Sequence, residues 1–281
     1  MESQNQEVNR PQVQTDTQNS TPLPRPTNIP ETVQQEVRIE VPYDVIPLPS
    51  KGLLYPGRKP TVEVEYLTAM DENILTSPNL LQSGKFVDVL LKRKIRAGQI
   101  NPQELLIGDR NAIIIWLRAT GYGEKYPVTV QTPDGEEFES EVDLTELKQK
   151  EIGATPDENG LFDFTLPMSK KKVKFRLLTA KDEDDLQKRE DAQRKRKSEV
   201  LDTLTHKMGT HIMSVDGRTD KEWIHNFVRV MPARDSLELR KYINKIEPGV
   251  DLSITVEGPG GDPVDSFLVI GPDFFWPDFG L

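Results

Sequence analysis

Three histidines are the side chains of this chain best suited to bind a metal or to move a proton near neutral pH. His206 and His211 are five positions apart, which places them on different faces of a helix, and His225 lies further along the chain. No Asp or Glu has a spacing that would complete a metal-binding triad with them. The chain has no cysteine, which excludes disulfides, thiol chemistry and cysteine-based zinc sites. The sequence therefore predicts neither a metal site nor a cofactor.

Other patterns that could support catalysis or nucleic-acid binding are weak. The glycine-rich stretches near Gly121 and Gly258 precede predicted strands, whereas a phosphate-binding loop needs a helix N-terminus. No serine lies in a nucleophile elbow. The basic run 194–197 follows acids one turn earlier, and the net charge of −10 repels phosphate backbones. These features favour a protein that is not an enzyme, with a carboxylate site between the two halves of the chain as the alternative hypothesis.

The elements that position these residues include a strand and capped helix that occur twice. Residues 62–75 read VEVEYLTAMDENIL and residues 173–186 read VKFRLLTAKDEDDL, at an offset of 111 positions. In each, alternating apolar residues indicate a strand, and a Thr followed three positions later by Asp indicates a helix N-terminus. Helical segments and a hairpin follow each copy. We interpret this as an internal duplication; the alternative is that any strand leading into a capped helix converges on such residues.

Further helices and strands follow each copy in the same order. In the first half we expect a helix beginning at Phe86, a helix over 110–120 capped by Asp109 and ended by Gly121, and a hairpin over 126–142. In the second half the pattern predicts one charged helix over 180–208, whose first part lies in solvent. A short strand over 212–215, a helix capped by Thr219 with Glu222, and a hairpin over 252–270 come next.

The fold class that these elements predict is α+β, with two related lobes that each pack helices on a small antiparallel or mixed sheet. Residues 1–40, rich in Gln, Thr and Pro, form a predicted disordered tail. Residues 41–150 form the first lobe and residues 151–281 the second, which includes the helix 180–208 and an aromatic C-terminal peptide, 271–281. No stretch reaches the roughly 20 apolar residues of a membrane helix. The start of the chain lacks an apolar signal core, so we expect residence in a cytoplasm.

Two segments combine proline with apolar residues in a way that regular structure does not explain. The first is VPYDVIPLPSKGLLYPG, an extended segment with a turn at 50–52, which needs cover from its own lobe or from a partner. The second is GPDFFWPDFGL, which either folds back onto the second lobe or anchors in a neighbouring subunit. The predicted partner-binding residues are Pro49, Ser50, Lys51, Gly52, Tyr55, Phe274, Phe275, Trp276, Phe279 and Leu281.

Several of these residues carry a resemblance to a known family. Leu48-Pro49-Ser50-Lys51-Gly52-Leu53-Leu54-Tyr55-Pro56, the segment Leu105–Arg110, the segment Gly121–Tyr126 and the aromatic end 273–281 resemble the baseplate hub and hub-assembly proteins of T-even-type contractile-tailed bacteriophages. The resemblance covers 43–147 well and the second half in patches. It implies Cys pairs at the first hairpin, as in a zinc ribbon, but this chain has the plain turn Gln131-Thr132-Pro133-Asp134-Gly135 there.

The resemblance implies a non-enzymatic tail protein that builds the baseplate hub, either as a structural component or as an assembly factor. Its partners would be other tail and baseplate proteins, with no nucleic acid, membrane or small-molecule substrate. It would act in the host cytoplasm during assembly and in the virion tail baseplate if retained. The alternative is a cytoplasmic tail-assembly chaperone, for example for the tape measure protein, that is absent from the mature virion.

Overall fold

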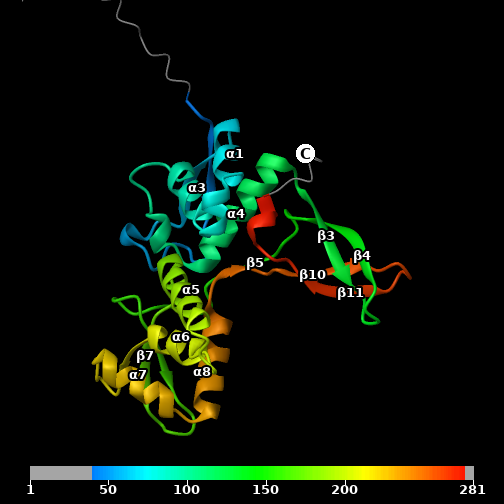
Figure 1. The fold of residues 1–281 in the computed structure, drawn as a ribbon. Coiled ribbons are helices and arrows are strands. Elements are labelled where there is room, and N and C mark those ends of the chain that lie inside the picture. The colour runs from blue at the N-terminus through cyan, green and yellow to red at the C-terminus, as the bar shows by residue number, and fades with distance from the viewer. Residues whose placement is uncertain (1–39, 276–281) are drawn as a thin grey trace, which may run out of the picture. The chain divides into compact units, whose positions relative to one another are not determined.

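Helices alternate with short antiparallel strands along residues 40–275, the part of the chain that the computed structural model describes (Figure 1). The elements of the first half are β1 (Tyr43–Pro47), β2 (Thr61–Glu65), α1 (Ala69–Leu75), α2 (Pro78–Gln82), α3 (Phe86–Lys94), α4 (Ile107–Tyr122), β3 (Lys125–Gln131), β4 (Glu137–Asp143) and β5 (Gln149–Lys150). The elements of the second half are β6 (Phe162–Thr165), β7 (Lys172–Phe175), α5 (Ala180–Lys195), α6 (Thr203–His211), β8 (Ile212–Val215), α7 (Lys221–Val230), α8 (Ala233–Ile246), β9 (Gly249–Val250), β10 (Ser253–Glu257) and β11 (Pro263–Phe267). Three single-turn 3₁₀ helices complete the set, η1 (Pro56–Arg58), η2 (Pro102–Glu104) and η3 (Pro272–Phe275). The predicted α+β class is confirmed.

The first sheet carries the strand that the sequence pattern predicts. β1 and β2 pair antiparallel, and alternate residues of β2 are buried, with Val62 1% and Val64 0% exposed. Val64 also forms an antiparallel bridge with Ile95, the residue that follows α3. The chain therefore leaves β2, passes through α1 to α3 and returns to the edge of the same strand.

The second sheet repeats this path. β7 lies between β6 and β8, and Val173 and Phe175 point into the core at 1% and 0% exposure. Phe175 pairs with Ile212, the residue that follows α6, just as Val64 pairs with the residue that follows α3. Phe175 stacks at 5.6 Å on Phe162 of β6, which fixes the strand pair over the core.

A capping box with a buried ion pair follows β2. The carboxylate of Asp71 accepts hydrogen bonds from the backbone N–H and hydroxyl of Thr68 at 2.8 and 2.7 Å. The Nζ of Lys94, at the end of α3, lies 2.6 Å from the same carboxylate and donates to the carbonyl of Tyr66 at 2.9 Å. Asp71 and Lys94 are 0% and 1% exposed, so the pair fastens the start of α1 to the end of α3.

The equivalent capping box after β7 uses a different cation. Asp182 accepts from the backbone N–H and hydroxyl of Thr179 at 2.9 and 2.8 Å, and two bonds of 2.6 and 2.7 Å come from the guanidinium of Arg176. Arg176 lies on the incoming strand segment, while the position at the end of α6 is taken by His211. The two halves of the chain thus contain a strand, a capped helix, a helix that leads back to the strand, and a bridge, in the same order. An origin by duplication stays a prediction.

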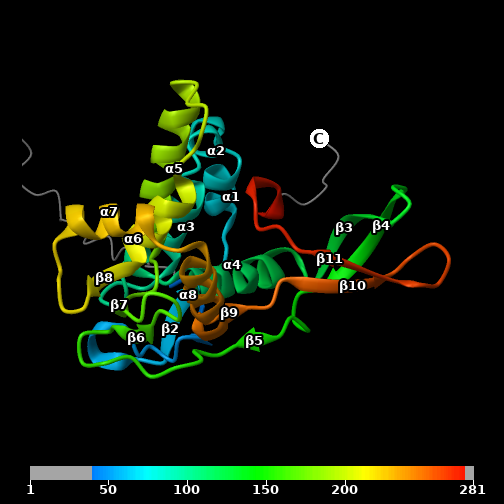
Figure 2. The ribbon, with the colours of Figure 1, turned by 90° about the horizontal axis from the view of Figure 1, so that it is seen from below.

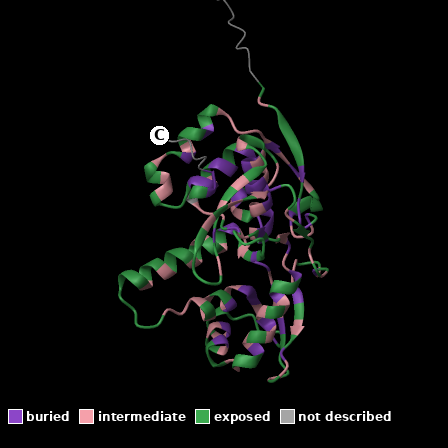
Figure 3. Cartoon of the chain, turned by 90° about the vertical axis from the view of Figure 1, so that its right-hand side faces the viewer, coloured by how far each residue is buried: buried purple, intermediate pink, exposed green. Residues whose placement is uncertain are grey.

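The predicted continuous helix over 180–208 is wrong. α5 ends at Lys195, Lys197 adopts a positive φ of 55°, and α6 begins at Thr203. The guanidinium of Arg189 holds Asp202 at 2.7 Å, so α6 folds back beside α5. Among the side chains of α5 only Ala180 is buried, and the predicted exposure of this helix is confirmed (Figure 3).

Three predicted helix boundaries also differ. α4 begins at Ile107, so Asp109 lies inside its first turn and is fully buried instead of acting as the cap. The helix continues past Gly121 to Tyr122 and ends at Gly123, whose φ is 97°. At α7 the cap is Asp220, which accepts from the backbone N–H of Trp223 at 2.7 Å, and not the neighbouring threonine, Thr219. The side chain of Asp220 satisfies a terminal N–H group of α7, whereas no side chain caps the start of α4.

The two hairpins predicted from turn residues are confirmed and lie side by side (Figure 2). β3 and β4 form one, and β10 and β11 form the other, with contacts between β10 and β4 and between β11 and β3. Val130, Val256 and Val264 are buried between them. The contacts join these elements in one unit that begins at Val41. The domain boundary near residue 150 stays a prediction.

Candidate functional site

Buried hydrogen bonds fasten residues 48–56, here called the proline loop, to the start of α4. The carboxylate of Asp109 accepts from the backbone N–H of Ser50 at 2.9 Å and from the hydroxyl of Tyr55 at 2.5 Å. The Tyr55 hydroxyl accepts in turn from the backbone N–H of Leu106 at 2.8 Å. Ser50, Tyr55 and Asp109 are 0%, 6% and 0% exposed. The loop signature is therefore anchored to the protein's own core.

The electrostatics of this network keep the tyrosine hydroxyl protonated. Burial raises the pKa of Asp109, and the hydrogen bonds from Ser50 and Tyr55 offset part of that rise. Burial, followed by the charge of Asp109, raises the pKa of Tyr55. A protonated hydroxyl can donate to the carboxylate while it accepts from the helix backbone. The arrangement is that of a structural clasp.

Close backbone approach explains the glycine of the loop. Gly52 has a φ of 68°, and a Cβ there would lie 1.9 Å from the carbonyl oxygen of Lys59.

Two of the other predicted residues of the loop contact the segment around residue 151. The carbonyl of Pro49 accepts from the backbone N–H of Ile152 at 3.2 Å. Lys51, with its side chain 52% exposed, forms an ion pair of 2.5 Å with Glu151. Of the five predicted partner-binding residues in this loop, Lys51 alone is exposed.

We expect Tyr55→Phe to lower the free energy of unfolding by about 1–3 kcal/mol. The substitution leaves the backbone N–H of Leu106 and one oxygen of Asp109 without their buried partner, while the ring volume is kept. Tyr43→Phe is the matched control, because the Tyr43 side chain is 46% exposed and its change should stay within about 0.5 kcal/mol. Urea unfolding of both variants measures the difference. Equal midpoints would show that the clasp does not stabilise the loop.

The described part of the C-terminal aromatic segment, residues 271–281, packs on the first half of the chain. Phe274 and Phe275 are 0% and 2% exposed. Their rings lie 5.0 Å from that of Tyr126 and 6.5 Å from that of Phe86, respectively. The guanidinium of Arg118 donates to the carbonyl of Phe274 at 3.0 Å. These contacts correct the expectation that the segment folds back onto the second lobe, because the two rings pack beside α3 and α4.

The remaining residues predicted for partner binding in this segment lie outside the described residues. They are Trp276, Phe279 and Leu281. The predicted disordered tail of residues 1–40 also falls outside the described part of the chain, apart from its last residue. The role of these residues in partner binding stays a prediction.

Two of the three histidines come together across α6 and α7, which sequence spacing did not suggest. The imidazoles of His206 and His225 stack with centroids 5.1 Å apart and planes 13° apart. Gly209 permits this approach, since a Cβ there would lie 2.5 Å from Nδ1 of His225. His211 is buried elsewhere, with Nδ1 2.8 Å from the carbonyl oxygen of Arg176. Because a carbonyl only accepts, that Nδ1 carries the hydrogen.

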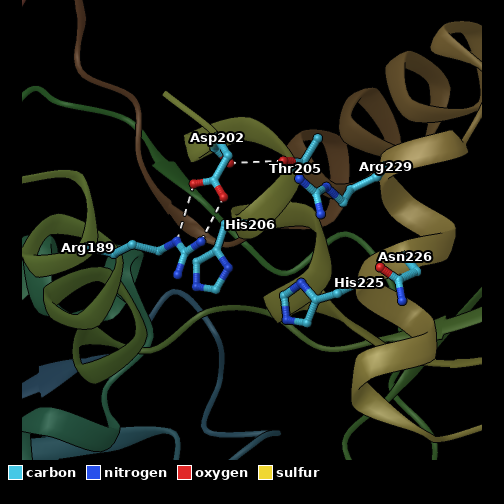
Figure 4. A pocket seen from close by; sticks show the side chains of 7 residues that line it. All are labelled: Arg189, Asp202, Thr205, His206, His225, Asn226 and Arg229. Atoms are coloured by element: carbon cyan, nitrogen blue, oxygen red, sulfur yellow. Dashed lines mark hydrogen bonds and ion pairs between the residues drawn. The ribbon is translucent and has the colours of Figure 1, made fainter. Parts of the chain in front are cut away.

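The stacked histidines line a cavity of about 320 Å³ that lies among α5, α6 and α7 (Figure 4). We call it the histidine cavity, and its lining residues are Arg189, Asp202, Thr205, His206, His225, Asn226 and Arg229. Burial, then the charge of Arg189 and then that of His225, lowers the pKa of His206. Within the described residues no three His, Asp or Glu side chains converge as a metal site would require. The lining suits an anion better than a cation.

A cluster of carboxylates between the two halves is the nearest structural counterpart to the alternative enzyme hypothesis. Burial, and then the neighbouring charge of Asp184, raises the pKa of Asp88, against the effect of Arg110. The guanidinium of Arg110 lies 3.2 Å from Asp88 and 3.9 Å from Glu183. Asp88 and Glu183 therefore share the cation of Arg110, and Asp184 accepts from the side-chain amide of Gln103 at 3.3 Å, which is the arrangement of an ion-pair network.

The pH dependence of stability should contain a distinct contribution from His211. Burial lowers its pKa to about 4, against the contrary effect of the Arg176 carbonyl; the nearby charged groups are Lys207, Arg176 and Asp182. The unfolded chain takes up this proton near pH 6.5 and the folded chain only near pH 4, so stability falls as the pH falls through that window. At about 1.4 kcal/mol for each pKa unit, the loss approaches about 3 kcal/mol.

The variant that tests this contribution is His211→Asn, whose side-chain amide reaches the position of Nδ1. We expect its free energy of unfolding to vary less between pH 6.5 and pH 4 than that of the unmodified protein. Chemical unfolding at several pH values gives both curves. Parallel curves would show that another group is responsible for the acid sensitivity.

The buried polar side chains described so far stabilise the fold of the protein itself. The candidate binding surface is a small cationic cavity. A family model described as "T4 bacteriophage base plate protein" matches residues 43–260. The chain belongs to this family of phage base plate proteins. Neither the comparison with curated proteins nor the comparison with solved structures gives a match.

Membership of the family implies a place in the phage tail and contact with other tail proteins. It confirms the family resemblance that the sequence motifs carried. None of the described helices combines the length and the apolar composition needed to cross a lipid bilayer.

Proposed function

We propose that the protein is a non-enzymatic component or assembly factor of the baseplate hub, acting through protein–protein contacts. The observation that carries this proposal is the match of the base plate family model to residues 43–260. The buried carboxylates support it, because Asp71, Asp109 and Asp235 are each engaged in structural hydrogen bonds or ion pairs. Groups occupied in this way are not free to act on a substrate.

The proposed contact sites are one residue of the proline loop and the last predicted residues of the C-terminal aromatic segment. In the proline loop this role falls to Lys51, since the other four predicted partner-binding residues of the loop are buried. In the C-terminal aromatic segment it falls to Trp276, Phe279 and Leu281, beyond the two phenylalanines that the fold uses itself. Aromatic side chains are frequent anchors at interfaces because they bury a large area with few rotatable bonds.

A chain that ends at Phe275 separates docking from folding. It keeps both buried rings and loses the proposed anchors, so we expect unchanged thermal unfolding and impaired baseplate assembly. A chain that ends at Gly271 is the comparison, and it should lose stability as well. Full assembly with the chain that ends at Phe275 would remove the anchoring role from the last six residues.

Mass spectrometry of purified particles and of infected-cell lysate tests the proposed function. Near-stoichiometric copies, measured against a hexameric baseplate protein, would support a structural component acting in the virion. Absence from particles, together with capture of hub proteins from the lysate, would support an assembly factor acting in the host cytoplasm. Capture of unassembled tape measure protein, without hub proteins, would favour the chaperone alternative and contradict the proposal.

A further inference from the structure

The histidine cavity presents cationic and hydrogen-bonding groups that the chain itself leaves without partners. Among the described residues, the exposed side chains of Arg229 and Asn226 on α7 make no hydrogen bond or ion pair, and both line the cavity. Figure 4 shows them on the same helix as His225, facing the side chains that come from α5 and α6. An unpaired guanidinium beside a free amide is a ready donor set for an anion.

The charge balance of the cavity is positive in a chain of net charge −10. The charged and titratable groups that line it are Arg189 from α5, Asp202 before α6, His206 on α6, and His225 and Arg229 on α7. The guanidinium of Arg189 is neutralised by two hydrogen bonds to Asp202, at 2.7 and 3.2 Å. Arg229 therefore leaves one uncompensated positive charge, to which a protonated His206 adds another.

The imidazole of His206 gives the cavity a response to bound charge. Its ring lies 5.1 Å from that of His225 and lines the cavity together with Arg229, so a proton on His206 adds a positive charge near that guanidinium. A bound anion offsets the repulsion between the two charges and favours the protonated form of His206. Binding of an anion and uptake of protons should therefore reinforce each other.

We propose that the histidine cavity binds a carboxylate from an acidic segment of a neighbouring tail protein, with Arg229 and Asn226 as the primary donors. The volume of about 320 Å³ accommodates an Asp or Glu side chain with part of its backbone. The choice of a protein ligand rests on the proposed function, in which this chain acts by contact with other proteins.

The test uses the full chain and a short peptide of consecutive Glu residues with blocked ends, titrated calorimetrically in low salt at pH 5.5 and pH 7.5. The same peptide with Gln in place of Glu, and inorganic phosphate, are the comparison probes. We expect the Glu peptide to bind, to bind more tightly at pH 5.5, and to weaken about tenfold or more in Arg229→Gln. Arg234→Gln removes the same charge from an exposed position outside the cavity and should bind like the unmodified protein.

A second variant changes the cavity without changing its charge. Gly209→Ala displaces His225 from the face of α6, so the affinity for the peptide should fall and the pH dependence should weaken. Equal affinity in Arg229→Gln and Arg234→Gln would overturn the proposal, as would binding of phosphate with no binding of the Glu peptide. Binding of neither probe would also overturn it. These results leave the particle analysis untouched, so failure of this site is distinguishable from failure of the hub assignment.

Discussion

We expect Lys94→Met to lower the free energy of unfolding by about 3–5 kcal/mol, because it removes the buried cation from a buried carboxylate. Nζ of Lys94 lies 2.6 Å from Asp71 and 2.9 Å from the carbonyl of Tyr66, and the two side chains of the ion pair are 1% and 0% exposed. Methionine preserves most of the side-chain volume, so a cavity contributes little to the loss. The loss in the free energy of unfolding therefore measures the effect of removing the buried cation from the carboxylate of Asp71.

The neighbouring Arg93 provides a control at the same carboxylate. Its Nε lies 2.7 Å from the other oxygen of Asp71, but its side chain is 48% exposed, and that oxygen accepts no hydrogen bond. Arg93→Met should therefore cost about 1 kcal/mol or less. Denaturant unfolding of both variants, near neutral pH, gives the comparison. Similar losses in the two variants would mean that burial does not determine the strength of this ion pair.

The acid response of the Lys94 variant adds an independent check. Burial alone raises the pKa of Asp71, while the bonds from Lys94 and Thr68 outweigh it and hold the pKa below its usual value. A carboxyl with a lowered pKa stabilises the fold above that range and loses its contribution as the pH falls. Without Lys94 the carboxyl takes up a proton at higher pH. The deficit of Lys94→Met should then shrink on acidification.

The second large effect concerns the C-terminal rings, for which Phe275→Ala should cost about 3–5 kcal/mol. Phe275 is 2% exposed, and its ring makes edge contacts with Phe86 at 6.5 Å and Phe274 at 5.7 Å. Removing the ring opens a cavity between η3 and α3 that the surrounding backbone cannot fill. Calorimetric or urea unfolding measures the loss.

The matched control for this ring is a phenylalanine on the last hairpin. Phe267 is 75% exposed, so Phe267→Ala should change the free energy of unfolding by no more than about 0.5 kcal/mol. If both variants had the same small effect, the segment would not be part of the folded core. The anchoring proposal would then extend to Phe274 and Phe275.

The elements that sequence reasoning predicted well depend on interactions between near neighbours. The cap of α1 forms between Thr68 and Asp71, three residues apart, and the cap of α5 between Thr179 and Asp182 in the same way. Such bonds depend on local spacing, which a sequence shows directly. Alternation in β2 and β7 and the turns of the two hairpins are local signals of the same kind.

The features that sequence reasoning missed depend on partners far along the chain. The sequence pattern indicates a helix cap at Asp109, but in the fold its carboxylate binds Ser50 and Tyr55, which lie more than 50 positions away in the chain. The end of α5 carries no Gly or Pro signal, and the turn-back to α6 is held by Arg189 and Asp202, 13 positions apart. The stacked histidines likewise meet only after α6 and α7 pack together, so no spacing rule could identify the cavity.

The most direct test of the account is to inactivate the gene for this protein in its phage and to count complete baseplates in the lysate by electron microscopy. We predict that complete baseplates are lost and that plasmid-borne supply of the unmodified protein restores them. A lysate with a normal number of complete baseplates in the absence of the protein would contradict its assignment to the baseplate hub.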